Sequence, residues 1–418
     1  MKNEPKKRLH RNPTPPSAQC LPEDSTHPDP FTEGLSCHLV GGAVRDALLG
    51  RPSAERDWVV LGATPEAMLE RGFKQVGRAF PVFLHPETKE EYALARTENK
   101  TAPGHTGFEV RFSPDVTLEE DLQRRDLTIN AMALDPRGNT LLDPWGGRRD
   151  LEKRLLRHVS PSFRDDPLRV LRVARFRATL NGFTVAGETS VLLTEMVGHG
   201  ELACLSPERL FDETRKALGG ENPAAFFTAL EEWGALQALF PELAALKRRS
   251  PCRCHHRAAT LWQHALQALD AACGLSRDPR LRLAALLHEL EPEEARGLCR
   301  RLRAPNAYQE AAFLGCRFHK PVRRALALSP TGILRLLDAM DVWRQPERLN
   351  GVVQVCRADL LARRAEAASL PQLTFLEACL EQGRRLTGAS LKLPPGPELG
   401  LALHQARRRL IARLRRGY

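Results

Sequence analysis

The chain has 418 residues, enough for about two to four domains with buried cores, and its 42% hydrophobic and 27% charged residues are ordinary for a globular protein. No apolar run approaches the ~18 residues of a membrane span, and we recognise no signal peptide. The net charge of +11 favours a polyanionic partner, because Lys and Arg gain free energy by releasing phosphate counterions. The 10 cysteines are scattered through segments whose pattern is otherwise helical, so we expect reduced thiols and a cytoplasmic location.

The beginning of the chain differs in composition from the rest. Residues 1–36 hold seven prolines and several basic side chains, with almost no apolar periodicity. Such a segment buries too little apolar surface to offset the entropy of ordering, so we expect a disordered arm. Its Lys6-Lys7-Arg8 cluster is more typical of a solvated tail than of an RNA contact.

Residues 37–160 alternate short strand-like runs with helices, and they open with a pattern typical of a phosphate-binding turn. The run 38–60 reads as a strand, a Gly41-Gly42 turn, an amphipathic helix and a second strand. Glycines between a strand and a helix let backbone N–H groups approach phosphate oxygens near the positive helix N-terminus. The alternative is an ordinary βαβ unit whose glycines are there for steric reasons.

An acidic pair at the start of the second strand favours a metal site. Glu55 and Asp57 are two residues apart, so their side chains project from one face of a strand. Two carboxylates on one face repel each other unless a cation lies between them. A Mg²⁺ site that bridges nucleotide phosphates and an attacking hydroxyl is the candidate, and solvated acids at a strand end are the alternative.

The segments GGAVRDALLG and RDWVVLGATPEAML resemble the head domain of class II tRNA nucleotidyltransferases, the bacterial CCA-adding enzymes. The resemblance implies a polymerase-β-like head, with Glu55 and Asp57 as catalytic metal ligands and with Gly42 and Arg45 at the nucleotide. The family pattern is Asp-x-Asp, whereas this chain has Glu55 at the first position. Glu is one methylene longer, which implies altered metal geometry or weaker affinity.

Local patterns predict the rest of the head. Thr64 is a helix N-cap followed by Pro65, and PVFLH and EEYALARTE are expected strands. Glu91 lies in the second of these strands and resembles the third carboxylate of the family; a surface acid on an edge strand is the alternative. Residues 99–111 are expected to form a loop, which in the resembled family helps the enzyme switch from CTP to ATP.

The segment DLQRRDLTINAMAL at 121–134 resembles the second signature of the family. We expect an Arg-Arg-Asp run that enters an apolar helix, which places Arg125 where its forked guanidinium meets the triphosphate or the nucleotide. The alternative is a salt bridge between Arg125 and Asp126 at the start of that helix.

Residues 161–250 are expected to form a helical neck that begins with one helix over 161–182. Asp165 is the predicted cap of this helix. Asp166 and Arg169 are three residues apart, so they are expected to be neighbours on one helical face.

Arg172 and Arg175 continue this line at the same spacing, with a solvated basic helix as the alternative. The run DDPLR at 165–169 resembles the family's EDxxR motif. The resemblance implies that Asp166 and Arg169 hydrogen-bond the base of the incoming nucleotide and that Arg172 and Arg175 contact the nucleotide too. A carboxylate accepts from the exocyclic amine that cytosine and adenine have and uracil lacks.

Residues 251–365 resemble the HD phosphohydrolase domain attached to many CCA enzymes, although several ligands are missing. His264 and His288 match the two histidines, Glu289 stands for the paired Asp, and Asp359 matches the last acid. A di-metal hydrolase must combine imidazole and carboxylate ligands. Because the Gly-Lys and the later His-rich segment are absent, we expect a degenerate HD-like domain with structural histidines and no phosphohydrolase activity.

Two further segments carry weaker signals. Cys252-x-Cys254-His255-His256 has the residue types of zinc ligands but no second ligand pair, so a zinc site is not favoured. Residues 366–418 are expected to form a helical tail whose basic face suits tRNA or solvent.

The expected fold class is α+β, with a mixed-sheet nucleotidyltransferase head followed by an all-α neck, a degenerate HD-type body and a tail. The leading hypothesis is a Mg²⁺-dependent enzyme that adds or repairs the 3′-terminal CCA of tRNA from CTP and ATP without a template. Its expected partners are the tRNA 3′ end and the two nucleotides, without a membrane. A bacterial poly(A) polymerase and a non-catalytic tRNA-binding homologue are the alternatives.

Overall fold

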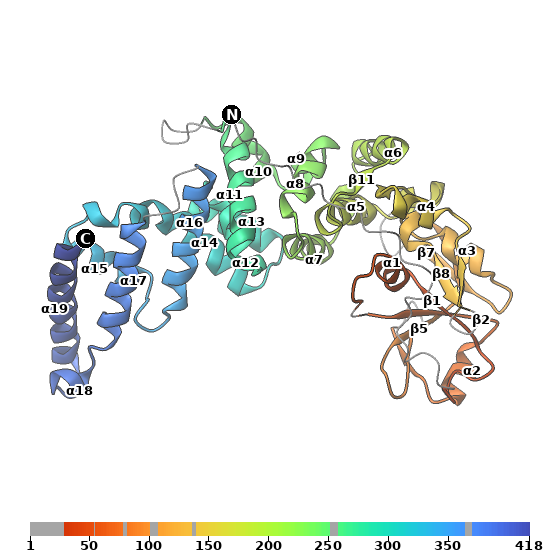
Figure 1. Cartoon of the computed structure of the whole chain (residues 1–418), viewed down its shortest axis with the longest axis horizontal. Coiled ribbons are helices and arrows are strands. Elements are labelled where there is room, and N and C mark those ends of the chain that lie inside the picture. The colour runs from red at the N-terminus through yellow and green to blue at the C-terminus, as the bar shows by residue number, and fades with distance from the viewer. Residues whose placement is uncertain are drawn as a thin grey trace, which may run out of the picture. The chain divides into compact units, whose positions relative to one another are not determined.

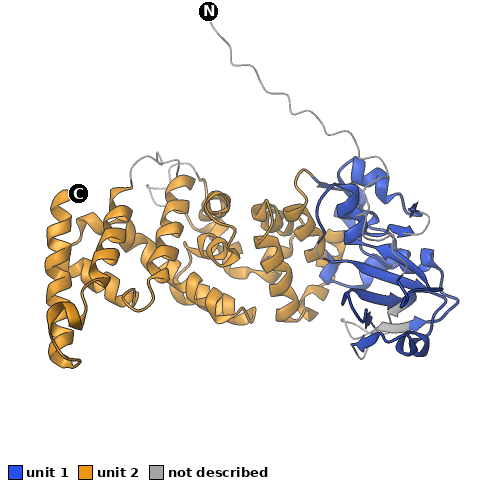
Figure 2. Cartoon of the chain, turned by 60° about the horizontal axis from the view of Figure 1, so that its bottom comes forward, with its two compact units in different colours: residues 1–169, 183–192 blue, residues 170–182, 193–418 orange. Residues whose placement is uncertain are grey.

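The computed structural model describes residues 29–53, 55–77, 82–100, 108–135, 139–250, 258–363 and 370–418. The chain divides into two compact units (Figure 2). Unit 1 comprises Met1–Arg169 and Phe183–Leu192, and unit 2 comprises Val170–Gly182 and Leu193–Tyr418. Two of the crossings between the units lie within helices, α5 (Leu168–Thr179) and α6 (Gly187–Gly198).

Unit 1 is built on a seven-stranded mixed sheet with the strand order β3-β4-β5-β2-β1-β8-β9. Strands β1, β2, β5 and β8 of this sheet are labelled in Figure 1. Its strands are β1 (Ser36–Val40), β2 (Asp57–Leu61), β3 (Lys74–Val76), β4 (Val82–Leu84), β5 (Glu91–Leu94), β8 (Ala133–Asp135) and β9 (Thr140–Leu142). The central strand β2 is antiparallel to β1 and parallel to β5. The predicted mixed sheet is therefore confirmed.

Short helices and two small ladders complete unit 1. The helices are α1 (Gly42–Leu48), α2 (Pro65–Glu70), α3 (Leu118–Gln123) and α4 (Gly147–Glu152), with 3₁₀ turns at Thr128–Asn130 and Pro161–Asp165. The ladders pair β6 (Arg96–Lys100) with β7 (Phe108–Phe112) in antiparallel and β10 (Leu155–Leu156) with β11 (Thr184–Val185) in parallel. Thr64 caps α2 through its hydroxyl, as predicted.

Apolar side chains cover both faces of the large sheet. On one face, Trp58 of β2 stacks on Tyr92 of β5 at a ring-centroid distance of 5.5 Å. On the other face, Val59 belongs to a cluster that contains Leu122 of α3. Because side chains alternate along a strand, Asp57 lies on the same face as Val59 and α3. Burial on both faces explains why β2 reads as the continuous apolar run WVVL after Asp57.

The described residues of unit 2 consist of helices and their connections. After α5 and α6 come α7 (Pro207–Leu218), α8 (Pro223–Glu232), α9 (Ala235–Leu239), α10 (Pro241–Ala245), α11 (Leu261–Leu275), α12 (Pro279–Leu287), α13 (Pro292–Arg301), α14 (Asn306–Arg323), α15 (Pro330–Ala339), α16 (Glu347–Ala362), α17 (Pro371–Arg384), α18 (Gly388–Leu391) and α19 (Pro397–Leu414). One hydrophobic core of this unit is formed by α14, α15, α16, α17 and the end of α19. None of the helices in the described ranges is both long and apolar enough to cross a membrane.

The folded part of unit 1 begins before the predicted boundary at residue 37. Asp29 Oδ2 lies 3.1 Å from His85 Nε2, and the Phe31 ring packs edge-on against the same imidazole. Burial of an aromatic ring against the sheet holds this part of the predicted arm in place. Residues 1–28 lie outside the described residues.

The predicted loop over 99–111 is shorter than expected. β6 continues to Lys100 and β7 begins at Phe108, so strand residues occupy both ends of that range. Residues 101–107, the remainder of the predicted loop, lie outside the described part of the chain.

The prediction of an apolar helix within 121–134 is wrong. α3 ends at Gln123, before the Arg-Arg-Asp run, and the chain continues through a 3₁₀ turn into β8. Leu127, Ile129 and Met132 have no exposed surface. A turn that is buried on all sides produces an apolar run that cannot be told from a buried helix by its pattern alone.

The prediction of a single helix over 161–182 is also wrong. A 3₁₀ turn ends at Asp165, and α5 begins only at Leu168. Asp166 has extended backbone angles (φ −114°, ψ 107°), because a following proline disfavours the α-helical region. Its Oδ1 accepts the Leu168 N–H at 3.0 Å, so Asp166 binds the first turn of α5.

Candidate functional site

The acidic end of β2 is the first part of the candidate site. Asp57, the first residue of β2, pairs in parallel register with Glu91, the first residue of β5. Both residues are exposed, and paired residues of neighbouring strands project from the same face. Glu55 is also exposed and lies two residues before Asp57, outside the strand. The structure therefore gathers the three predicted acids at the end of the sheet where β2 and β5 begin.

The environment of Asp57 resists a lone negative charge. Although the residue keeps exposed surface, burial of its carboxylate against the head raises its pKa. The positive charge of Arg125 lowers the pKa of Asp57, and the negative charge of Glu55 raises it. A group with a raised pKa gains from any additional cation that stabilises its ionised form. The electrostatics of this end of the sheet therefore favour cation binding.

These acids fit a magnesium ion whose coordination is completed by substrate. Mg²⁺ in nucleotide enzymes is usually bound by one or two carboxylates together with phosphates and water. Within the described ranges, the one group of three or more potential ligands that lie within 4.8 Å of one another is in unit 2. The acids of the head therefore do not surround an ion with protein ligands, which leaves coordination positions for the substrate.

The glycine turn and Arg125 are the second part of the site. Gly41 has φ 71°, in the left-handed region that favours glycine. A Cβ on Gly41 would lie 3.1 Å from Arg125 Nη1, whereas a Cβ on Gly42 would make only ordinary contact with Arg45. Sequence reasoning emphasised Gly42, but Gly41 is the residue whose conformation and neighbours require glycine. The turn and Arg125 are thus packed against each other.

A buried carboxylate that the sequence analysis did not single out, Asp121, pairs with Arg125. Asp121 is 0% exposed; its Oδ2 accepts from Arg125 Nη2 at 3.1 Å and its Oδ1 from Arg124 Nη2 at 2.7 Å. The alternative salt bridge between Arg125 and Asp126 is therefore wrong. The run DLQRRD contained the signal, because residues three and four positions apart are neighbours on a helix.

Arg45 connects the two segments that carry the family resemblance. Its Nε and Nη2 donate to Asp46 at 2.9 Å and 2.8 Å, and its Nη1 donates to Asn130 Oδ1 at 2.7 Å. Asn130 Nδ2 donates in turn to Asp126 Oδ1 at 3.0 Å. Asp126 and Asn130 were missed as individual residues, and they join the RRDLTINA segment to α1.

The predicted base-reading residues Asp166 and Arg169 both belong to unit 1. Arg169 Nη1 donates to the Ser162 carbonyl at 2.9 Å, and its Nη2 donates to the Arg124 carbonyl. The Arg169 N–H bonds the Asp166 carbonyl at 3.0 Å. The two residues are therefore neighbours, but not through a shared helical face, because Asp166 precedes α5.

Arg172 and Arg175 lie in unit 2 and share an acidic partner. Arg175 Nε donates to Glu213 Oε2 of α7 at 2.6 Å, and Arg172 Nη1 lies 4.0 Å from Glu213 Oε1. Glu213 is only 3% exposed, and the Arg175 guanidinium also stacks 4.2 Å from the centre of the Phe176 ring. This buried partner was not predicted, and it fixes the arginine face of α5 against α7.

The four residues that match HD ligands also come together, in unit 2. His264 of α11, His288 and Glu289 after α12, and Asp359 of α16 have ligand atoms within 4.8 Å of one another. His264 Nε2 lies 2.9 Å from Asp359 Oδ1, and His288 Nε2 lies 3.5 Å from Glu289 Oε1. All four side chains are buried. The sequence match therefore predicted a real spatial cluster.

Basic side chains already neutralise the two acids of this cluster. Asp359 Oδ1 accepts from Arg363 Nε at 2.7 Å and its Oδ2 from Arg323 Nη1 at 3.1 Å. Glu289 has Lys320 Nζ at 3.5 Å and Arg363 Nη2 at 3.7 Å. Burial alone would raise the pKa of Asp359, but its histidine hydrogen bonds and Arg363 hold that pKa well below its usual range. The donor types suit a metal, but guanidinium groups hold the same oxygens, so the cluster does not fit an ion as it stands.

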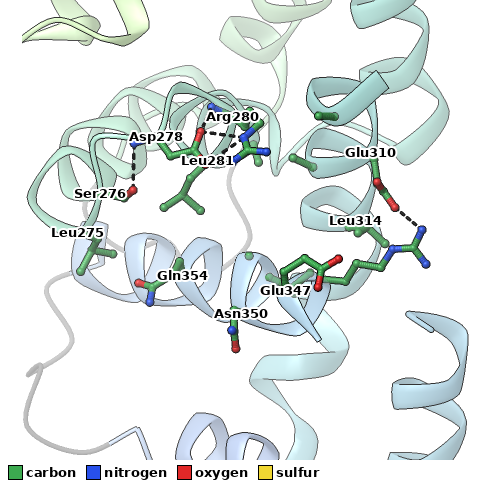
Figure 3. Close-up of a pocket in the computed structure, with 16 residues that line it drawn as sticks. Leu275, Ser276, Asp278, Arg280, Leu281, Glu310, Leu314, Glu347, Asn350 and Gln354 are labelled. Carbon is green, nitrogen blue, oxygen red and sulfur yellow. Dashed lines mark hydrogen bonds and ion pairs between the residues drawn. The ribbon is translucent and has the colours of Figure 1, made fainter. Parts of the chain in front are cut away.

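Unit 2 also contains an open pocket of about 460 Å³ between α12, α14 and α16 (Figure 3). Leu281 contributes to its apolar floor. Charged groups at its rim pair with one another: Arg280 Nη2 lies 2.7 Å from Asp278 Oδ2, and Arg348 pairs with Glu310. Because these four charges are matched, they do not select a ligand by charge.

The cluster from Cys252 to His256, at which a zinc site was not favoured, lies outside the described residues. The cysteines that the structure describes are all free, in agreement with the expectation of reduced thiols.

Two family models match the chain. Residues 37–157 match the poly A polymerase head domain, and residues 182–247 match the segment described as the probable RNA and SrmB-binding site of polymerase A. The first match contains the acidic end of β2, the glycine turn and Arg125.

Relatives that match most of the chain carry a different description. The multifunctional CCA protein of Hahella chejuensis is 48% identical over 366 residues, which cover 82% of this chain and 86% of the relative. That of Thioalkalivibrio sulfidiphilus is 47% identical over 408 residues, covering 91% and 99%. The Bacillus stearothermophilus CCA-adding enzyme, solved in complex with CTP, has a TM-score of 0.62 at 26% identity, over 91% of this chain and 90% of that chain.

These relatives favour a CCA protein over a poly(A) polymerase, although the head model bears the polymerase description. Identity of this extent over nearly the whole chain confirms the resemblance noted in the sequence. The chain belongs to the multifunctional CCA protein family and is a nucleotidyltransferase.

Proposed function

We propose that this chain adds or repairs the 3′-terminal CCA of tRNA from CTP and ATP, without a nucleic-acid template. The observation that carries the proposal is made at the start of β2. There Asp57 is paired with Glu91, and Arg125 is close enough to lower the pKa of Asp57. This end of the sheet offers carboxylate oxygens to a metal ion and a guanidinium group to a triphosphate. We also assign the protein to the cytoplasm, which its free described cysteines support.

Nucleotidyltransferases of this family are generally metal-dependent, and we infer that the metal here is Mg²⁺. Glu55 and Asp57 would hold it, with Glu91 as the third carboxylate. When bound, the ion would neutralise triphosphate charge and help the RNA 3′-hydroxyl lose its proton. That hydroxyl oxygen forms the new bond to the α-phosphorus, and the bond to pyrophosphate breaks.

The glycine turn and two arginines are proposed to bind the triphosphate. The Gly41 N–H donates to the Met132 carbonyl at 3.3 Å, but the first N–H groups of α1, beginning with Gly42, have no partner within the helix, and Arg45 and Arg125 flank the turn. Arg125 and Asp57 affect each other electrostatically, so a triphosphate bound by Arg125 would lie next to the catalytic carboxylate.

Asp166 and Arg169 are proposed to choose the base. Arg169 donates from two nitrogens of its rigid fork to the carbonyls of Ser162 and Arg124. Those bonds fix the orientation of the guanidinium, which a template made of protein needs in order to read a base edge. Arg172 and Arg175, held by Glu213, are proposed to bind the nucleotide further along α5.

We further propose that the HD-like cluster does not hydrolyse phosphate esters. Arg323 and Arg363 bind the oxygens of Asp359 that a metal would need. The test is hydrolysis of p-nitrophenyl phosphate with Mg²⁺, Mn²⁺ or Ni²⁺ by the wild type and by Asp359→Ala. Hydrolysis by the wild type that Asp359→Ala abolishes would contradict the proposal.

Extension of a labelled tRNA that lacks CCA tests the main proposal, with Mg²⁺ and CTP alone, ATP alone, or both. We expect two additions with CTP and a third only when ATP is present. A long ladder with ATP alone would identify a poly(A) polymerase, and a stop at CC with both nucleotides would identify a CC-adding enzyme. Binding of tRNA without any extension would leave the non-catalytic homologue.

A further inference from the structure

One buried carboxylate touches both arginines of the RRDLTINA segment. Asp121, near the end of α3, has no exposed surface. Its Oδ1 accepts from Arg124 Nη2 at 2.7 Å and Nε at 3.1 Å, and its Oδ2 accepts from Arg125 Nη2 at 3.1 Å. The Arg96 N–H adds a longer contact of 3.4 Å to Oδ1. Four N–H groups on three residues therefore converge on this carboxylate.

Asp121 carries its charge inside the protein because these neighbours stabilise it. Burial alone would raise the pKa of Asp121, but the charges and hydrogen bonds of Arg124 and Arg125 hold it below its usual range. Charge-assisted bonds from a guanidinium fork are stronger and more directional than neutral ones. Asp121 therefore fixes where both arginine side chains point.

Each arginine leads from Asp121 to a different part of the proposed nucleotide site. Arg125 lies against the Gly41 turn and lowers the pKa of Asp57 through its charge. Arg124 leads the other way, because its carbonyl accepts a hydrogen bond from Arg169 Nη2. The Asp121 carboxylate thus contacts Arg125, at the part of the proposed site that binds the triphosphate, and Arg124, at the part that binds the base.

We propose that Asp121 is a positioning residue for nucleotide binding, which sets Arg125 at the triphosphate and, through Arg124, supports the base-reading Arg169. The inference rests on the proposed function of Arg125 and Arg169. It assigns to Asp121 no contact with the substrate. Its effect is expected on nucleotide affinity and base choice, and not on tRNA affinity.

Asp121→Asn removes the negative charge and keeps the shape of the side chain. We expect the dissociation constants and KM values for CTP and ATP to rise on the order of 10- to 100-fold, and the preference for CTP over UTP to fall. The tRNA dissociation constant and kcat at saturating nucleotide should change by less than about threefold. Glu119→Gln is the matched control, since Glu119 is an exposed acid of the same helix.

A double-mutant cycle separates positioning from a general loss of stability. If Asp121 acts through Arg125, Asp121→Asn in an Arg125→Lys background should cost much less than the two separate losses together. Additive losses, or unchanged nucleotide affinity in Asp121→Asn, would overturn the proposal. If Asp121→Asn does not fold, as judged by circular dichroism, Arg125→Lys decides alone, and unchanged nucleotide affinity there overturns it.

The readout keeps the two proposals distinct. Equilibrium binding of labelled CTP reports on Asp121 even in a protein that extends no tRNA. Failure of the wild type to extend tRNA would contradict the proposed function, whereas normal extension with a wild-type CTP affinity in Asp121→Asn would contradict only this inference.

Discussion

The two acidic clusters of the chain both contain Asp and Glu carboxylates but differ in what balances the charge of these groups. In unit 1, Asp57 and Glu91 are exposed at one end of the sheet, and burial leaves the pKa of Asp57 raised. In unit 2, Asp359 and Glu289 are buried and lie against basic side chains, and the pKa of Asp359 is lowered. The first cluster can take a cation from outside, whereas the second is neutralised within the fold. The neighbours of a carboxylate, and not its residue type, distinguish the two.

Removal of the proposed catalytic carboxylate, Asp57, should have the largest effect. We expect Asp57→Ala to lower the rate of tRNA extension on the order of a thousandfold or more, because the proposed metal loses a ligand beside the reacting groups. Asp359→Asn, the matched change in the second cluster, should leave that rate within about threefold. Single-turnover extension measures both, and equal losses would contradict the separation of roles.

Asp359→Ala should destabilise the protein strongly. It removes the buried carboxylate that Arg323, Arg363 and His264 share as a partner, which typically costs about 3–5 kcal/mol of unfolding free energy. Urea unfolding followed by circular dichroism measures this loss. Glu381→Ala removes an acid from an exposed surface pair and should leave the unfolding free energy unchanged. A similar midpoint for both variants would mean that the cluster contributes no stability.

Removal of one guanidinium should make the second cluster more like the first. In Arg363→Leu, Asp359 Oδ1 loses its 2.7 Å donor while the imidazole and carboxylate ligands remain. We expect this variant to bind Ni²⁺ or Co²⁺ about tenfold more tightly than the wild type, since an N/O ligand set suits these ions. Isothermal titration calorimetry is the measurement, with Asp359→Asn added to Arg363→Leu as the control. Equal affinity of wild type and variant would contradict the role of the guanidinium.

The second cluster should also give the stability a distinct pH dependence. Burial alone would lower the pKa of His288, but Asp359 and Glu289 raise it to about 9, above its ordinary value of 6.5. Protonated His288 therefore contributes stability that is complete below about pH 6.5 and is lost as the pH rises through 9. Urea midpoints should fall over this interval in the wild type and fall less in His288→Gln. Parallel decline in the two proteins would assign the effect to other groups.

The smallest effect is expected at the first acid of the head. Glu55→Asp restores the family pattern and shortens the side chain by one methylene. Because Glu55 is exposed and outside the strand, we expect it to reach the metal already, and the extension rate to change by only about two- to threefold. Extension rates at several Mg²⁺ concentrations measure this. A large gain would mean that the metal site has decayed.

Local patterns were enough to predict the strand that begins at Asp57 and the start of α2. The apolar run after Asp57 and the Thr64-Pro65 start depend on neighbours a few residues away, and the structure has a strand and a helix there. The family resemblance added the order of the segments and the spatial meeting of His264 with Asp359.

The rest depended on contacts that local patterns do not specify. The predicted helix over 161–182 was wrong because Pro167 acts on the residue before it, which the pattern of apolar residues does not show. The pairing of Arg323 with Asp359 joins residues 36 positions apart, and that of Arg175 with Glu213 joins residues 38 positions apart. Such contacts are set by how helices pack, so only the structure could reveal which charges are already paired.

The position of β2 in the middle of the seven-stranded sheet also determines how long the proposed catalytic site keeps its geometry. The amides of β2 face either β1 or β5, so all of them exchange their hydrogens with solvent only when the strand separates from both neighbours, and such openings approach the free energy of global unfolding. Asp57 is therefore attached to backbone that should be among the last to open. An ageing preparation of the enzyme should lose its tRNA or nucleotide contacts before it loses the geometry of this strand.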